Sequence, residues 1–164
     1  MNPRRVSCLA AIAAVAFTCV GPAQADEVLN FHFVTNSSSL QSLEVGDTAG
    51  HVLRLSSRSG IAIFPDGSVG SSQFSATNDY VKGAGSYLAY CNITLGDGSI
   101  LWFKVAGSAK VEDATTQFPE APVSVLRGSG RFEGARGHGT FKGQLMPFDL
   151  GGDLYADVVI NLEN

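Results

Sequence analysis

The most constraining feature of this sequence is a series of short apolar runs, each interrupted after about ten residues by glycine, proline or an Asp-Gly pair. No stretch of the mature region repeats its apolar residues with a helical period, and short runs bounded by turn residues are typical of strands. A one-domain antiparallel protein must also protect its sheet edges, and the usual solutions are barrel closure or a two-sheet sandwich. The fold class predicted from the pattern is therefore all-β, a single antiparallel domain of about eight strands in a closed barrel or a sandwich.

The apolar runs set the expected strand positions. We interpret as strands residues 27–34, 52–56, 61–64, 68–76, 86–95, 100–110, 123–128, 139–146 and 153–162. The intervening residues 35–50 are polar and rich in serine, so they are interpreted as a long loop. No shift in composition indicates a second domain.

One hairpin, centred on the Gly-Asp-Gly turn at residues 96–98, can be predicted to its register. A two-residue loop would place Lys104 opposite Cys91 and mix a charge into an apolar face. A three-residue loop instead pairs Cys91 with Phe103 and produces a continuous apolar face, because side chains alternate along each strand. We therefore predict the three-residue loop, with Tyr87 and Cys91 facing the core.

The N-terminal segment, residues 1–25, has the order of a secretory signal peptide. Arg4 and Arg5 precede an apolar run, and the segment ends in Ala-Gln-Ala at Ala25. The apolar run, residues 9–20, is shorter than the roughly 20 residues that span a bilayer, so no stable membrane insertion is expected. We predict cleavage after Ala25 and a secreted or periplasmic protein.

The predicted mature domain, residues 26–164, keeps nine of the 11 cations and all 15 acids, a formal net charge of −6. Without a basic excess, nucleic acid is not an expected partner. Its single cysteine, Cys91, cannot form an internal disulfide, and we interpret its thiol as buried. His32, His51 and His138 lie in separate segments without metal-ligand spacing, so neither a metal nor another cofactor is expected.

The most distinctive segment is the glycine-rich stretch at residues 128–143. Its glycine spacing differs from the dinucleotide-binding fingerprint, and a predicted strand follows where that fingerprint requires a helix. We interpret the segment as a strand end, a compact turn in which Phe132 packs against the end of the barrel, and a new strand from about Gly139.

This turn resembles the Gly-x-Gly-x-Phe/Tyr-x-Gly-x-x-Gly-x-Gly segment of allene oxide cyclase and dirigent-like barrels of the calycin type. The matching residues are Gly128, Gly130, Phe132, Gly134, Gly137 and Gly139. Gly85-Ser-Tyr87, Cys91, the 96–98 turn and Trp102-Phe103 also look like bacterial secreted members, so the resemblance covers about residues 45–162. It implies an eight-stranded barrel, a homo-oligomer and a mostly apolar cavity. Plant members cyclise an unstable epoxide or steer the coupling of phenoxy radicals.

Five residues are candidates for ligand binding, and no catalytic residue is carried over from the family. Tyr87, Cys91 and Phe103 lie on the predicted apolar face. Arg131 and Glu133 flank the glycine turn, where they would frame a barrel mouth for an anionic or phenolic ligand. The alternative is that the charged residues form local surface ion pairs, which contribute little, and that the many phenylalanines fill the barrel.

Three functions remain open from the sequence. The first is a secreted barrel that binds or steers a small hydrophobic or aromatic molecule without strong chemistry of its own. The second is a cyclase or isomerase in which Tyr87, Cys91 and either Glu133 or Arg131 orient and protonate a reactive intermediate. The third is a packed structural or interaction module that works through an oligomer interface.

Overall fold

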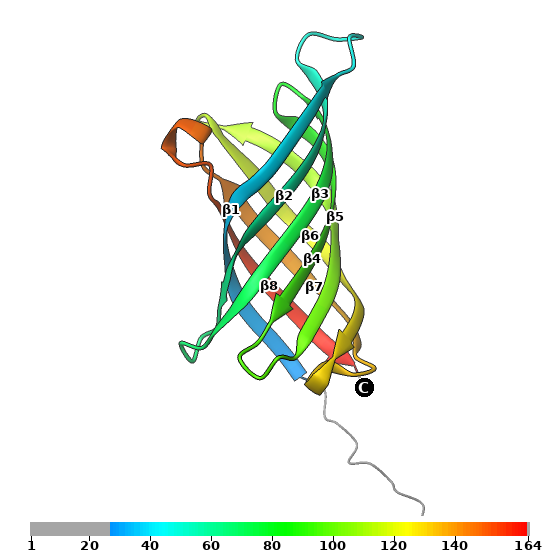
Figure 1. Ribbon diagram of the computed structural model, residues 1–164. Helices are drawn as coiled ribbons and strands as arrows, with labels where there is room; N and C mark the ends of the chain where they lie inside the picture. The colour runs from blue at the N-terminus through cyan, green and yellow to red at the C-terminus, as the bar shows by residue number, and fades with distance from the viewer. Residues whose placement is uncertain (1–26, 164) are drawn as a thin grey trace, which may run out of the picture.

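The computed structural model describes residues 27–163, which form eight antiparallel strands closed into one barrel (Figure 1). The strands are β1 (Glu27–Glu44), β2 (His51–Ile63), β3 (Val69–Val81), β4 (Ala84–Thr94), β5 (Ile100–Glu112), β6 (Thr115–Ser129), β7 (Arg136–Leu145) and β8 (Leu154–Glu163). Two single-turn 3-10 helices, η1 (Gly130–Phe132) and η2 (Phe148–Leu150), lie in the last two connections. Each strand pairs with its neighbours in the chain, and β8 pairs with β1. The predicted closed barrel is confirmed, whereas the predicted signal peptide lies outside the described residues.

Strict alternation of side chains explains why these strands close around one core. In β8, every second residue from Leu154 to Leu162 is buried and faces the barrel interior. The predicted hairpin register is confirmed, because Cys91 lies opposite Phe103 and Tyr87 is buried. The apolar halves of the strands therefore determine both the pairing and the direction of each side chain.

The predicted loop at residues 35–50 is wrong over most of its length. β1 continues to Glu44, and its second half pairs with β2 after a register shift near Ser37. This part of the hairpin projects beyond the barrel (Figure 1), so its side chains are largely exposed and backbone hydrogen bonds maintain the pairing. The runs 52–56 and 61–64 likewise form one strand, β2, which ends at Ile63.

The two ends of the barrel are named here from their connections. The mouth is the end where the β1–β2, β3–β4, β5–β6 and β7–β8 connections turn. The base is the opposite end, with the remaining connections and both ends of the described chain. Figure 1 shows the mouth at the top and the base at the bottom.

The lower part of the barrel is filled by phenylalanine rings. Phe31, Phe33 and Phe103 are at most 1% exposed, with ring centroids 5.2 Å apart for Phe31–Phe33 and 5.9 Å for Phe33–Phe103. Phe132 of η1 is equally buried and closes the base, as predicted from the glycine turn. Gly128 permits this packing, because a Cβ there would lie 2.4 Å from the Phe132 Cβ. The base is thus a closed, apolar end.

Candidate functional site

A small cavity of about 50 Å³ lies inside the barrel at the mouth. All its lining residues come from the mouth halves of their strands or from the middle of β3. They are Leu40, Arg54, Ser56, Arg58, Phe74, Asn78, Tyr80, Tyr87, Phe118, Leu145 and Leu154. We call this space the mouth cavity. It has two arginines and no aspartate or glutamate in its lining, although the whole chain carries a formal net charge of −4.

Arg58 points from β2 across the cavity toward the β7–β8 connection. Its Nε donates to Thr35 Oγ1 at 3.2 Å, and its Nη2 donates to the carbonyl oxygens of Thr35 and Gly152. The side chain is buried and forms no ion pair with any acid among residues 27–163. Burial lowers the pKa of Arg58, while the charge of Asp153 raises it. A guanidinium held this way is a fixed positive charge in a poorly hydrated space.

Two further donors lining the cavity have no partner. The Tyr87 hydroxyl and the Arg54 Nε are buried, and neither makes a hydrogen bond within the described chain. Burial raises the pKa of Tyr87, with smaller contributions from Tyr80 and Cys91, so its phenol stays protonated and acts as a donor. Buried polar groups nearly always have a partner, from the protein or from ordered water. These two atoms therefore indicate where a polar group would bind.

The position of Tyr87 depends on a glycine in the neighbouring strand. A Cβ at Gly107 would lie 2.7 Å from the Tyr87 hydroxyl and 2.8 Å from the Ala121 Cβ. The ring of Tyr87 also packs edge-on against Phe118, with centroids 5.3 Å apart and planes at 86°. Gly107 therefore leaves the room that the phenol occupies, and Phe118 fixes the plane of the ring.

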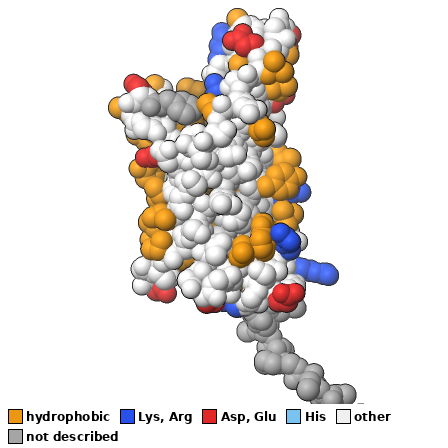
Figure 2. All heavy atoms as spheres, viewed as in Figure 1, with side chains coloured by type: hydrophobic (Ala, Val, Ile, Leu, Met, Phe, Trp, Pro, Cys, Tyr) orange, Lys and Arg blue, Asp and Glu red, His pale blue; other side chains and the backbone are white. Residues whose placement is uncertain are grey.

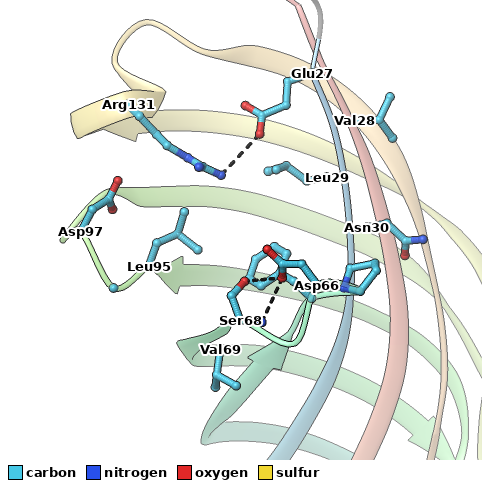
Figure 3. Close-up of a pocket in the computed structure, with 13 residues that line it drawn as sticks. Glu27, Val28, Leu29, Asn30, Asp66, Ser68, Val69, Leu95, Asp97 and Arg131 are labelled. Atoms are coloured by element: carbon cyan, nitrogen blue, oxygen red, sulfur yellow. Dashed lines mark hydrogen bonds and ion pairs between the residues drawn. The ribbon is translucent and has the colours of Figure 1, made fainter.

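The base carries a different groove, shown in Figure 3, with a volume of about 530 Å³. Arg131 and Glu27 point toward each other across it, and Arg131 Nη2 lies 3.4 Å from Glu27 Oε1. Asp66 accepts hydrogen bonds from the backbone N–H and hydroxyl of Ser68, and Asp97 accepts one from the backbone N–H of Ser99. These acids stabilise the β2–β3 and β4–β5 turns, which gives their carboxylates a local structural role.

The five predicted ligand-binding residues do not form one site. Tyr87 lines the mouth cavity, whereas Cys91 and Phe103 are packed in the middle of the barrel at 2% and 0% exposure. Arg131 lies in the groove at the base, and Glu133 is exposed in the β6–β7 turn beside η1. The predicted charged mouth around the glycine turn is therefore the closed end of the barrel.

Most residues of the mouth cavity are not among the five predicted ligand-binding residues. Arg54, Ser56 and Arg58 alternate along β2 and so share its inward face, which is a signal that the sequence contains. It was not recognised because the expected strand ended at Ser56. Phe118 lies ahead of the run interpreted as a strand. It comes just before Pro119, and proline is usually confined to edge strands, strand starts or bulges.

No metal site is present among residues 27–163, where no three His, Cys, Asp or Glu side chains are arranged to hold an ion. Cys91 offers no reactive thiolate either, since burial raises its pKa. In the same part of the chain, no helix is long and apolar enough to cross a membrane.

Comparison with known proteins identifies the fold. No protein-family model and no curated protein match this sequence. Among solved structures, the chain is similar to a pterocarpan synthase dirigent protein at 16% identity and a TM-score of 0.53, covering 92% of this chain and 98% of that one. A second pterocarpan synthase dirigent protein gives 14% identity and a TM-score of 0.54, covering 85% and 95%.

These likenesses define a class of fold, the dirigent-like eight-stranded barrel. The dirigent-like half of the predicted resemblance is thus confirmed for the fold. The likeness to allene oxide cyclase and to bacterial secreted members stays a prediction. At such low identity, the fold alone carries over, so the function of this chain must be argued from its own residues.

Proposed function

We propose that this protein binds a small, mainly apolar or aromatic molecule at the mouth of the barrel. By holding that molecule in one conformation, the protein would direct the course of its reaction. The observation that carries this proposal is the mouth cavity, where the Tyr87 hydroxyl and the Arg54 Nε are buried without partners above an apolar core. A polar group on the ligand would satisfy these donors. The likeness to dirigent barrels supports the proposal at the level of fold.

The size of the mouth cavity determines how such a molecule would bind. A void of about 50 Å³ holds a small functional group, whereas sites for whole drug-sized ligands usually have about 300–1,000 Å³. The polar end of the ligand therefore enters the cavity, and the remainder extends between the connections at the mouth. Leu40 of the projecting β1–β2 hairpin and Leu145 of β7 offer apolar contacts there.

The chemistry available at the mouth favours binding and steering over attack on the ligand. Cys91, the free cysteine of the described chain, is in the core and not in the cavity. The cyclase hypothesis needs an acid beside Tyr87, but Glu133 and Arg131 lie at the base. Steering by shape requires neither a nucleophile nor an acid, only a fixed binding geometry.

Native mass spectrometry of the protein purified from its host tests the proposal. A bound small molecule that is lost on denaturation is the expected result. Ser56→Leu fills the cavity from inside β2 and should abolish this extra mass. Ser57→Leu, its matched control, changes the next residue, which lies on the outer face of the same strand and outside the cavity lining, and should retain the mass. Retention of the molecule by Ser56→Leu contradicts the mouth site.

We propose secretion to the periplasm or the exterior on the strength of the signal-peptide pattern that precedes the barrel. Fractionation of the host, with N-terminal sequencing of the exported protein, tests both the compartment and cleavage after Ala25.

The second candidate function is an interaction module built from copies of this chain, and it rests on the outer wall. Leu43, Leu53 and Leu55 are exposed beside a mainly apolar outer groove of about 620 Å³ along β1 to β4. In the view of Figure 2, hydrophobic side chains lie in separate clusters along the edges of the barrel. Exposed apolar patches of this kind mark interaction surfaces.

Sedimentation velocity tests this second function. It should show an oligomer that Leu55→Lys dissociates, and a wild-type monomer at all concentrations would contradict the interaction module.

A further inference from the structure

The donors of the mouth cavity define a narrower class of ligand than an apolar or aromatic molecule. We propose that the ligand carries a carboxylate, whose oxygens accept hydrogen bonds from the Tyr87 hydroxyl and the Arg54 Nε in the field of Arg58. This inference rests on the proposed function, since it names the chemistry of the molecule that the mouth would hold.

Both unpartnered atoms of the mouth cavity can donate a hydrogen bond. The Arg54 Nε has a proton to donate and no lone pair to offer, and the Tyr87 phenol, protonated because burial raises its pKa, also has a proton available. Both groups line the same cavity. A ligand group that accepts a hydrogen bond from each would satisfy both, and a carboxylate does this with its two oxygens.

The lining of the mouth cavity has two arginines and no acid to balance their charge. Arg58 is 6% exposed and has only the neutral acceptors of Thr35 and Gly152, while Arg54 forms no ion pair within the described chain. Asp153 acts on Arg58 through its charge, but its carboxylate accepts a hydrogen bond from Asn36 at 2.7 Å and does not line the cavity. Burying a cation is unfavourable unless an anion accompanies it. An anionic ligand would complete the site.

The shape of the mouth cavity also limits which ligand group fits. The cavity is small, and the edge-on pair of Tyr87 and Phe118 forms one side of it. A planar carboxylate suits such a space, and arginine and tyrosine donors bind it with charge-assisted hydrogen bonds. Leu40, Leu145 and Leu154 add apolar contacts around the same space. The ligand class is therefore a monocarboxylate with an apolar or aromatic body.

Titration calorimetry with a matched pair of probes tests the inference. The probes are 2-naphthoate and 2-naphthalenemethanol at pH 7, which share an apolar body and differ in the carboxylate. We expect wild-type protein to bind 2-naphthoate at least roughly 10-fold more tightly, because hydrogen bonds to a charged acceptor are stronger than those to a neutral one.

Variants locate this preference at the mouth. Arg54→Met and Tyr87→Phe should each weaken 2-naphthoate binding by roughly 5-fold or more and leave 2-naphthalenemethanol within about 2-fold. Arg136→Met is the matched control, because this exposed arginine begins β7 at the base, and it should change neither affinity. If Arg54→Met does not fold, Arg54→Lys replaces it, because lysine keeps the positive charge and lacks the Nε–H donor. The wild-type preference between the two probes still decides whether the ligand carries a carboxylate.

The outcomes separate this inference from the proposed function. Equal affinity of wild-type protein for the two probes overturns the carboxylate and leaves a mouth that binds apolar molecules. Preference for 2-naphthoate that survives both Arg54→Met and Tyr87→Phe also overturns it, because these two donors then do not recognise the carboxylate. Failure of both probes to bind, or binding that Ser56→Leu does not reduce, overturns the mouth site itself.

Discussion

The two ends of this barrel finish the same eight strands in different ways. At the base, Phe132 fills the opening and belongs with Phe31 and Phe103 to one buried apolar core. At the mouth, Tyr87 and Arg58 face a void, and some of the polar atoms there lack partners. Packed apolar side chains stabilise a fold, whereas unsatisfied polar groups cost stability. The comparison indicates that the base maintains the fold and that the mouth is available for binding.

The largest effect should come from opening the base. Phe132→Ala removes a ring that is 1% exposed and leaves a cavity, so we expect a loss of about 3–5 kcal/mol in the free energy of unfolding. Urea denaturation followed by tyrosine and tryptophan fluorescence measures it. Glu133→Ala changes the exposed neighbour and should stay within about 0.5 kcal/mol of wild type. Equal effects of the two substitutions would show that the Phe132 ring does not stabilise the base.

A smaller loss should follow from overpacking the mouth. Gly107→Ala places a Cβ 2.7 Å from the Tyr87 hydroxyl, so either the phenol or the strand must shift, at about 1–3 kcal/mol. Gly96→Ala is the matched control, because a Cβ there meets nothing within 4 Å. Denaturation curves of both variants decide this, and a neutral Gly107→Ala would show that Tyr87 is free to move.

The same contrast explains what the sequence predicts well. The base is specified by local patterns: alternation around Cys91 and Phe103 determines a register, and a glycine cluster beside Phe132 predicts a plug. The mouth has no such pattern, because its residues come from seven strands and converge only after closure. The second half of β1 lacks the alternation that identifies a strand, because its side chains are mostly exposed, and the sequence therefore predicts a loop there.

Removing the unpartnered hydroxyl at the mouth should have the opposite sign. Tyr87→Phe deletes a buried group without a hydrogen bond, so the ligand-free protein should gain about 1 kcal/mol of stability. Tyr90→Phe, on the outer face of the same strand and 52% exposed, should change little. Thermal unfolding in the absence of ligand measures both. A loss of stability in Tyr87→Phe would show that the hydroxyl has a partner, such as an ordered water.

The smallest effect concerns electrostatics at the rim of the mouth, where His51 connects two segments. Its Nδ1 lies 2.5 Å from Asp47 Oδ1 in the β1–β2 turn, and its Nε2 lies 2.8 Å from Asp79 Oδ1 in β3. Only a protonated imidazole donates from both nitrogens. The hydrogen bonds to Asp79 and Asp47 raise the pKa of His51, and that to His51 lowers the pKa of Asp47.

The sign of the pH dependence follows from these shifts. Because the folded state binds the His51 proton more tightly, its contribution to stability is complete below about pH 6.5 and is lost as the pH rises through the raised pKa. The Asp47 contribution is present above about pH 3.9 and is lost as the pH falls through its lowered pKa.

Urea midpoints between pH 5 and 9 should therefore fall with rising pH, and His51→Gln should flatten that slope. His138→Gln, which removes an exposed histidine with a single carboxylate partner near the base, should leave most of it. A slope that survives His51→Gln would show that His51 is not its cause.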